Sequence, residues 1–178
     1  MGTNKTLKNA EAIHIKDELL SVFHAPDHKW KQYYYEDEEQ NVLFLVPSYL
    51  FYGIIIVDLD WARTATFTTK DGVVHMFRDY SWGMSTSKRK TSYPKATVTD
   101  RAAKCGQRTI LLNSLVSGHL FQEDDPDVKD RYAADHLNGN RFDNRHINVS
   151  WGTIKENNDN RYPYKNIPLP KYPCKIWW

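Results

Sequence analysis

The chain has 178 residues, enough either for one compact domain with a real core or for one such unit plus a small appendage. Its 24 basic and 22 acidic residues give a formal net charge of +2, so the charge of the whole molecule argues only weakly for a polyanionic partner. The cysteines Cys105 and Cys174 form no CxxC pair, which excludes a disulfide framework or a zinc ribbon and favours a reducing compartment.

Residues 1–60 are predicted to form a helix and then strands, with no role that the sequence assigns. Leu7–Phe23 has apolar residues three and four apart, which predicts an amphipathic helix. Val42–Val46 and Phe51–Leu59 are rich in β-branched and aromatic residues and predict two strands. This apolar stretch falls short of the roughly 20 residues that span a bilayer. Met1–Ala10 lacks the apolar segment of a secretion signal, so we expect a cytoplasmic protein with no membrane contact.

The middle of the chain is predicted to be mostly β structure. Arg63–Thr69 and Val73–Tyr80 flank Lys70-Asp71-Gly72, and an Asp-Gly pair between two strand-like runs predicts a hairpin. Trp82–Pro94 is rich in Gly, Ser, Thr and Lys and predicts an exposed loop. Leu111–Phe121 then has the apolar spacing of a short core helix.

Positive charge is concentrated in two regions. Between residues 78 and 108 eight bases stand against two acids, and Lys88, Arg89 and Lys90 are consecutive. The C-terminal tail, 161–178, carries four bases among aromatic residues and has no acid. The three consecutive bases are as compatible with solvated loop charge as with phosphate contacts, and the tail can strap the core or contact a nucleic acid.

A polar segment near the end of the chain predicts β, loop, β, helix within about thirty residues. Tyr132–His136 and Val149–Trp151 are strand-like, and the residues between them are dense in Asn, Asp and Gly, which favour turns. Thr153 followed by Glu156 is the capping-box signature of a helix start. Few apolar residues lie here, so the segment indicates chemistry rather than packing.

This segment resembles the HNH nuclease family of the phage and intron homing-endonuclease type, whose ββα-metal motif has this order of elements. The motifs that carry the resemblance are Asp135-His136, Asn138-Gly139-Asn140, Asp143-Asn144-Arg145, Asn148 and Glu156-Asn157. Twelve residues separate His136 from Asn148 and nine more lead to Asn157, so the pattern is the HNN variant. The resemblance covers about 135–160, extends more loosely to the preceding core helix, and gives no support for residues 1–60.

The expected fold is therefore α+β, with a β-rich N-terminal part followed by a ββα-metal (HNH) nuclease motif. We expect an N-terminal helix and strands over 1–60, an HNH endonuclease domain over 61–160 with the motif at about 132–160, and the basic aromatic tail.

The side chains suggest the chemistry of phosphodiester hydrolysis. His136 can accept the proton of a water molecule near neutral pH, which makes it the candidate general base. Asp135 and Asn157 offer hard oxygen ligands of the kind that Mg²⁺ favours, with Mn²⁺ as a substitute. The resemblance implies that Asn148 bonds across the loop and holds the base-bearing segment. Because neighbours on a regular strand face opposite ways, the pleat is expected to break at the Asp135-His136 pair.

The contact to the scissile phosphate is left open between Arg141 and Arg145, and Lys88, Arg89 and Lys90 are the candidate contacts to the rest of the nucleic acid. A zinc site built from His119, His146 and the two cysteines is disfavoured by their scattered spacing. For the other asparagines of the segment, among them Asn144, turn structure is the expected role.

The predicted function is a metal-dependent endonuclease that cuts or nicks duplex DNA, in the cytoplasm of a bacterial host if it is phage-encoded, without a small-molecule cofactor. The alternative is a DNA-binding or interaction module that keeps the ββα scaffold without turnover. The target sequence, the oligomeric state, nicking against double-strand cleavage, and an RNA substrate are not decided by the sequence.

Overall fold

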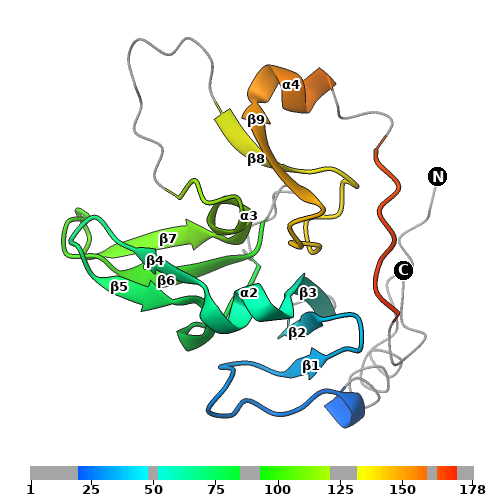
Figure 1. Cartoon of the computed structure of the whole chain (residues 1–178). Coiled ribbons are helices and arrows are strands. Elements are labelled where there is room, and N and C mark those ends of the chain that lie inside the picture. Colours follow the sequence, from blue (N-terminus) through cyan, green and yellow to red (C-terminus); the bar gives the residue numbers. More distant parts are fainter. Residues whose placement is uncertain (1–19, 48–51, 85–92, 121–131, 160–163, 172–178) are drawn as a thin grey trace, which may run out of the picture.

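The computed structural model describes residues 20–47, 52–84, 93–120, 132–159 and 164–171. The fold is mixed α+β, built from small antiparallel sheets with few short helices, as the sequence predicted at this level (Figure 1). Residues 20–22 are helical, but most of the predicted N-terminal helix lies outside the described residues. Among the residues that are described, no helix has the length and apolar character required to cross a membrane.

A three-stranded antiparallel sheet forms one end of the molecule. It consists of β1 (Tyr34–Glu36), β2 (Asn41–Pro47) and β3 (Tyr52–Asp58), in that order. The two predicted strands of this region are confirmed, and β2 pairs with β3 along its whole length. Alternate residues of β2 and β3 enter two separate apolar clusters, one on each face, which explains why their sequences are apolar without alternation.

The predicted Asp-Gly hairpin is confirmed but is shorter than the sequence suggested. Its strands are β4 (Thr66–Thr68) and β5 (Val74–Met76), and a 3₁₀ turn, η1, covers Phe77–Asp79. Arg63 and Thr64, expected in the first strand, instead end the helix α2 (Leu59–Thr64). This helix buries Leu59 and Ala62, and an ion pair of 3.1 Å joins Arg63 of its last turn to Glu36 of β1.

A second hairpin, which the sequence analysis did not predict, is formed by β6 (Lys95–Thr99) and β7 (Gln107–Leu111). Its buried face carries Ala96, Val98 and Ile110. The predicted exposed loop before it is wrong at Trp82, which is only 2 % exposed. The Trp82 ring stacks on that of Phe77 at 5.0 Å, and its Nε1 donates to the Phe77 carbonyl at 3.0 Å.

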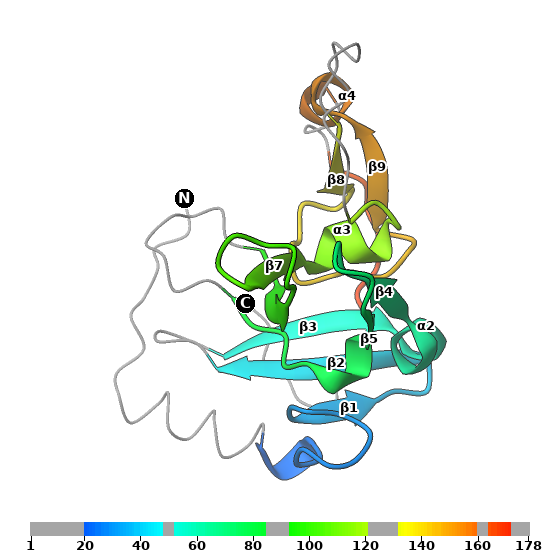
Figure 2. The same cartoon turned by 90° about the vertical axis from the view of Figure 1, so that its left-hand side faces the viewer.

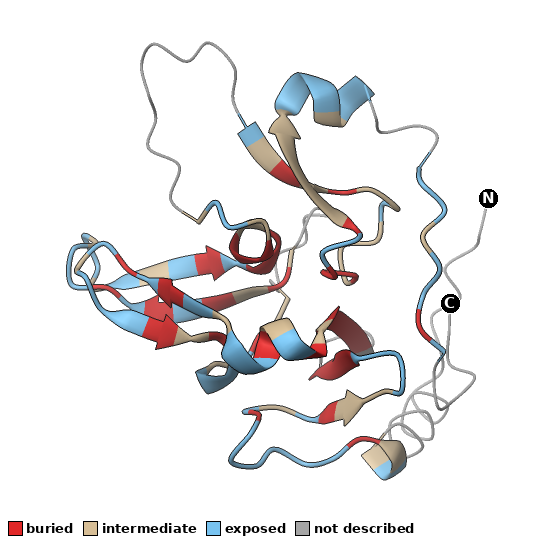
Figure 3. Ribbon diagram, viewed as in Figure 1, coloured by how far each residue is buried: buried red, intermediate tan, exposed pale blue. Residues whose placement is uncertain are grey.

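The predicted core helix is α3 (Leu112–Val116), and it ends before Gly118, whose φ of +78° reverses the chain at little steric cost. The last three elements are β8 (Tyr132–His136), β9 (Val149–Thr153) and α4 (Ile154–Asp159), with β8 and β9 paired antiparallel. The main apolar cluster combines β2, β3, α2, η1, the second hairpin and α3, so it includes residues on both sides of position 60 (Figure 3).

Phe77 is the centre of the aromatic part of this core. It is 1 % exposed, and the rings of Trp30, Phe44, Trp61 and Trp82 lie 5.0 to 6.5 Å from its own.

Replacing Phe77 with alanine should therefore lower the free energy of unfolding by about 3–5 kcal/mol, because the rigid rings around it cannot collapse into the cavity. The control is Val74→Ala, since Val74 is 64 % exposed and its truncation should cost under about 0.5 kcal/mol. Urea unfolding followed by tryptophan fluorescence measures both changes, and equal losses would contradict this account of the core.

Candidate functional site

The β8–β9 hairpin lies at the end of the molecule opposite β1, between two helices (Figures 1 and 2). On one side α3 reaches it through Asn113, whose Nδ2 donates to the Ala134 carbonyl at 3.1 Å. The ring of His119, just after α3, stacks on Trp151 of β9 at 4.2 Å. On the other side α4 follows β9 directly. The expected capping box is present, since Glu156 N donates to Thr153 Oγ1 at 3.0 Å and Thr153 N to Glu156 Oε2 at 2.8 Å.

The loop between β8 and β9, residues 137–148, is docked on the edge of the N-terminal sheet. Ile56 of β3 donates its N–H to Phe142 O at 2.9 Å and accepts from Asn144 N at 2.8 Å. Two residues further along both segments, Asp58 Oδ2 accepts hydrogen bonds from the backbone N and from Nδ1 of His146. Strand β3 therefore fixes the loop although almost ninety residues separate them.

Inside the loop, buried asparagine and aspartate side chains take the place of an apolar core. Asn148 is fully buried, accepts from Asn138 N at 2.9 Å and donates to Asp143 O at 2.7 Å, so it joins the two arms of the loop. Asp143 is fully buried as well and receives two guanidinium hydrogen bonds from Arg145, at 2.7 and 2.8 Å. Such a fixed backbone can hold a reactive side chain in one orientation.

His136 lies beneath this loop and is 3 % exposed. Its Nε2 is 3.0 Å from Asn144 Oδ1, while Asn144 Nδ2 donates to the carbonyls of Arg141 and Phe142. Because the amide nitrogen of Asn144 already has two acceptors, its oxygen must be the acceptor from His136. The proton of the neutral imidazole is thereby assigned to Nε2, and the lone pair that can accept a proton is on Nδ1.

Two further residues complete the surroundings of His136. The Tyr93 ring lies parallel to the imidazole at 5.9 Å, and the Arg141 guanidinium lies 5.0 Å from the centre of the Tyr93 ring. Burial lowers the pKa of His136 below its ordinary value of 6.5, against the raising effect of the Asn144 hydrogen bond and of the Asp135 and Asp143 charges. The imidazole is therefore neutral at pH 7, as proton acceptance requires.

The expected break of the pleat at Asp135-His136 is wrong. Regular pairing continues through Asp135 with Ser150 and His136 with Val149, and the chain leaves the ladder only after Leu137. The two side chains therefore leave β8 on opposite faces, the imidazole towards α3 and the carboxylate towards α4.

Asn157 lies on the same face of the hairpin as Asp135. Its Nδ2 donates to Ala133 O at 3.1 Å, and its Oδ1 lies 3.2 Å from where a Cβ of Gly152 would stand. Since Gly152 pairs with Ala133 and Ser150 with Asp135, these residues share one face. Two oxygen donors are thus placed on the α4 side. Among the described residues, no three His, Cys, Asp or Glu side chains gather as a metal-ligand group.

The predicted nucleic-acid contacts have different positions. Arg145 is 8 % exposed and, besides Asp143, donates to Pro168 O at 2.8 Å, so its guanidinium is engaged within the protein. Arg141 is half-buried beside Tyr93 and His136. Lys88, Arg89 and Lys90 lie outside the described residues, as does Cys174.

Part of the tail, residues 164–171, lies along the loop as a strap (Figure 1). Lys165 N donates to Leu137 O at 2.8 Å, and Pro168 receives Arg145. The Tyr164 ring covers Gly139, which has a φ of +74°; a Cβ there would lie 2.7 to 2.9 Å from three ring carbons. Of the two roles left open for the tail, strapping describes this segment.

Sequence reasoning missed three residues of the site. Asn144 was assigned to turn structure, yet it orients His136; its place in the Asp-Asn-Arg motif was the available signal. Tyr93 and Asn113 belong to no motif, and only the fold brings them to β8. In comparisons with known proteins, the chain matches no family model, no curated protein and no solved structure.

Gly139→Ala should destabilise the protein more than Gly118→Ala. Both glycines have positive φ, which costs alanine about 1–2 kcal/mol, but only Gly139 has a ring within contact distance of the added carbon. Adding Tyr164→Ala to Gly139→Ala should remove the excess over Gly118→Ala. Urea unfolding of the set measures these terms; an excess that survives loss of the ring would contradict the strap contact.

Stability should fall as pH drops below about 6.5 because His136 is buried in its neutral form. In that range the unfolded chain binds a proton that the folded chain does not, at a cost of up to about 1.4 kcal/mol per pH unit. His136→Gln should lose less stability than wild type between pH 7.5 and 5.5, whereas the exposed His28→Gln should follow wild type. Urea unfolding at both pH values decides the matter, and parallel behaviour of His136→Gln and wild type would overturn it.

Proposed function

We propose that the chain is a divalent-metal-dependent endonuclease of the HNH type, phage-encoded or homing, that hydrolyses phosphodiester bonds in duplex DNA by nicking or double-strand cleavage. The observation that carries the proposal is the environment of His136: a buried neutral imidazole with its proton held on Nε2 by Asn144, next in sequence to a carboxylate. The order of the motifs from Asp135 to Asn157 adds to it.

The phosphate would lie at the unpaired edge of β8. Among the described strands β8 pairs only with β9, and Asn113 covers its other edge at Ala134. Because Asp135 and His136 leave β8 on opposite faces, the phosphate would have to lie across this edge, just beyond Ala134, to contact both. Arg141 is preferred to Arg145 for the phosphate contact because its guanidinium lies beside Tyr93 and His136, whereas Arg145 is buried and bound to Asp143 and Pro168.

Asp135 and Asn157 would hold the ion, Mg²⁺ or Mn²⁺ as a substitute. The donor set fits: Asn157 uses Nδ2 for Ala133, which leaves its oxygen for the ion. The point where a Gly152 Cβ would stand lies 3.2 Å both from that oxygen and from Glu156 Oε2, so a side chain at 152 would crowd both oxygens. Two protein oxygens, completed by phosphate and water, suit an octahedral cation that keeps part of its hydration. When bound, such an ion supplies charge neutralisation on the phosphate oxygens.

In the proposed reaction Nδ1 of His136 takes a proton from water. The water oxygen forms a bond to phosphorus, and the bond from phosphorus to the 3′ oxygen breaks. The leaving oxygen takes a proton from solvent, which gives 3′-hydroxyl and 5′-phosphate ends. Asn144 keeps the accepting nitrogen directed at the water, and Asn148 keeps the loop in place.

His136→Ala should lower Mg²⁺-dependent nicking of supercoiled plasmid by about 10²-fold or more, since general-base catalysis contributes on that scale. His28→Ala, at an exposed histidine outside the site, should cleave as wild type does. Wild type should be inactive in EDTA, and a gel that separates supercoiled, nicked and linear forms gives all three results.

Duplex binding in EDTA, measured by band shift, separates this proposal from a binding module without turnover. His136→Ala should bind as wild type does. If this variant cleaves at the wild-type rate, His136 is not the general base. If wild type binds duplex DNA but does not cleave it in Mg²⁺ or Mn²⁺, the chain is a binding module instead.

A further inference from the structure

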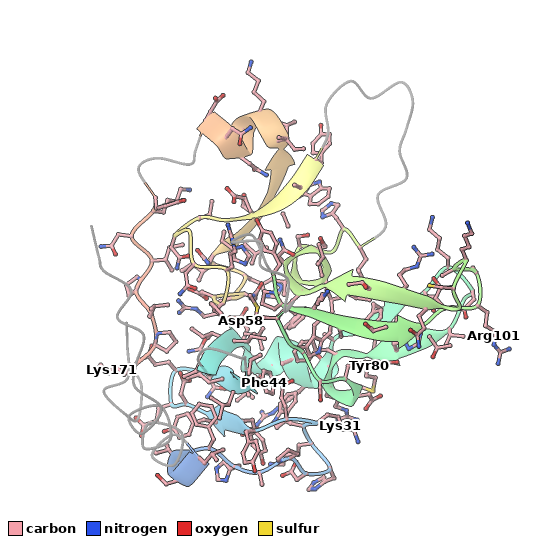
Figure 4. The ribbon with its side chains drawn as sticks, turned by 180° about the vertical axis from the view of Figure 1, so that it is seen from behind. Lys31, Phe44, Asp58, Tyr80, Arg101 and Lys171 are labelled. Carbon is pink, nitrogen blue, oxygen red and sulfur yellow. The ribbon has the colours of Figure 1, made fainter. Side chains whose placement is uncertain are left out.

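The turns of two hairpins meet at the end of the molecule farthest from the strap. The β4–β5 turn contains Lys70 and Asp71, and the β6–β7 turn spans 100–106. Arg101 N donates to Asp71 Oδ2 at 2.8 Å, which joins the turns into one structure (Figure 4). We call it the two-hairpin tip and define its outward cations as Lys70, Arg101 and Lys104, all exposed.

The acids of the two-hairpin tip are turned inward. Asp100 is fully buried and pairs with Arg108, which holds the pKa of its carboxyl below the ordinary value. Asp71 accepts from the Thr69 hydroxyl and from the backbone N–H of Val73 and Arg101. These two carboxylates are used to stabilise the turns, so the charged side chains that the two-hairpin tip directs to solvent are the three cations.

The outward face of the β6–β7 hairpin continues this surface without negative charge. Because strand residues alternate, Thr97 and Thr99 of β6 lie beside Thr109 and Gln107 of β7, and all four are exposed. Hydroxyl and amide side chains are usual donors to phosphate and sugar oxygens. The outward face of this pair of strands, about 13 Å long, therefore presents neutral hydrogen-bond donors, and the three cations lie beyond its turn end.

This surface is continuous in the chain with the candidate site. Strand β7 ends at Leu111, α3 begins at Leu112, and Asn113 of α3 contacts Ala134 in β8. The two-hairpin tip is therefore held at a fixed position relative to β8, more than one strand length away, which corresponds to several base pairs of duplex at about 3.4 Å each.

We propose that the two-hairpin tip and the outward face of β6–β7 bind the sugar–phosphate backbone of duplex DNA at a distance from the cleaved bond. The inference rests on the proposed function and extends it with a second, sequence-independent contact. Phosphate contacts of this kind position a duplex without reading its bases.

An anionic membrane is the other polyanionic surface that these cations could bind. Val73 and Val74, close to Lys70 in the chain, are exposed and are the apolar side chains that would enter it. The threonines and glutamine of the outward face favour DNA, because their donors match phosphate and sugar oxygens and add nothing to insertion among lipid chains. Vesicles therefore serve as the competing arm of the test.

The test compares two triple variants of the full chain. Lys70→Ser/Arg101→Ser/Lys104→Ser removes the outward cations. The control, Lys29→Ser/Lys31→Ser/Lys171→Ser, removes three exposed lysines elsewhere, of which Lys31 and Lys171 are labelled in Figure 4. Binding to a duplex of about 30 base pairs is measured by fluorescence anisotropy in EDTA at salt concentrations between about 50 and 300 mM, because counterion release makes the affinity change steeply over that range. Thermal unfolding midpoints check that both variants fold.

The slope of log affinity against log salt should become shallower by about 2 to 3 in the first variant, near 0.9 per lost phosphate contact, and stay as in wild type in the second. Equal slopes in the two variants overturn the proposal, as does tip-dependent binding to phosphatidylserine vesicles without any effect on DNA. Plasmid cleavage by wild type is scored separately, so the loss of this surface and the loss of the endonuclease assignment are told apart.

Discussion

The docking of loop 137–148 on β3 is the interaction on which the rest of the candidate site depends. Two backbone hydrogen bonds at Ile56 and the double acceptance by Asp58 hold the loop against a strand that is buried on both faces. Because β3 cannot shift without disturbing two apolar clusters, the loop inherits the rigidity of the core. The N-terminal sheet, to which the sequence assigns no role, is thus the platform on which the polar loop folds.

That platform allows a site built almost entirely from polar groups. A loop rich in asparagine and aspartate has too little apolar surface to fix its own shape, and its buried donors and acceptors are costly unless they are paired. In this loop the side chains of Asn148 and Asn144 form hydrogen bonds with backbone groups. The carboxylate of Asp143 is paired with the guanidinium of Arg145. The same pairing that makes their burial tolerable also fixes the tautomer of His136.

The sequence predicted those features that depend on local chemistry. The Asp-Gly turn, the Thr153–Glu156 capping box and the β-branched runs of β2 and β3 each act within a few residues, and each is found where it was expected. It failed where distant packing decides. Trp82 begins a loop-like stretch but packs into the ring cluster around Phe77. The opposite directions of Asp135 and His136 depend on how far the pairing with β9 extends, which no local pattern specifies.

The strap has a consequence for the order in which the protein matures. Residues 164–171 follow every other element of the site in the chain, yet they supply the ring over Gly139 and the acceptor for Arg145. During synthesis the N-terminal sheet emerges first and the strap last, so the polar loop has its platform early and its cover late. The polar loop of a nascent chain therefore stays uncovered until translation has passed the strap. Under the proposed function, the endonuclease site would be complete only at the end of synthesis.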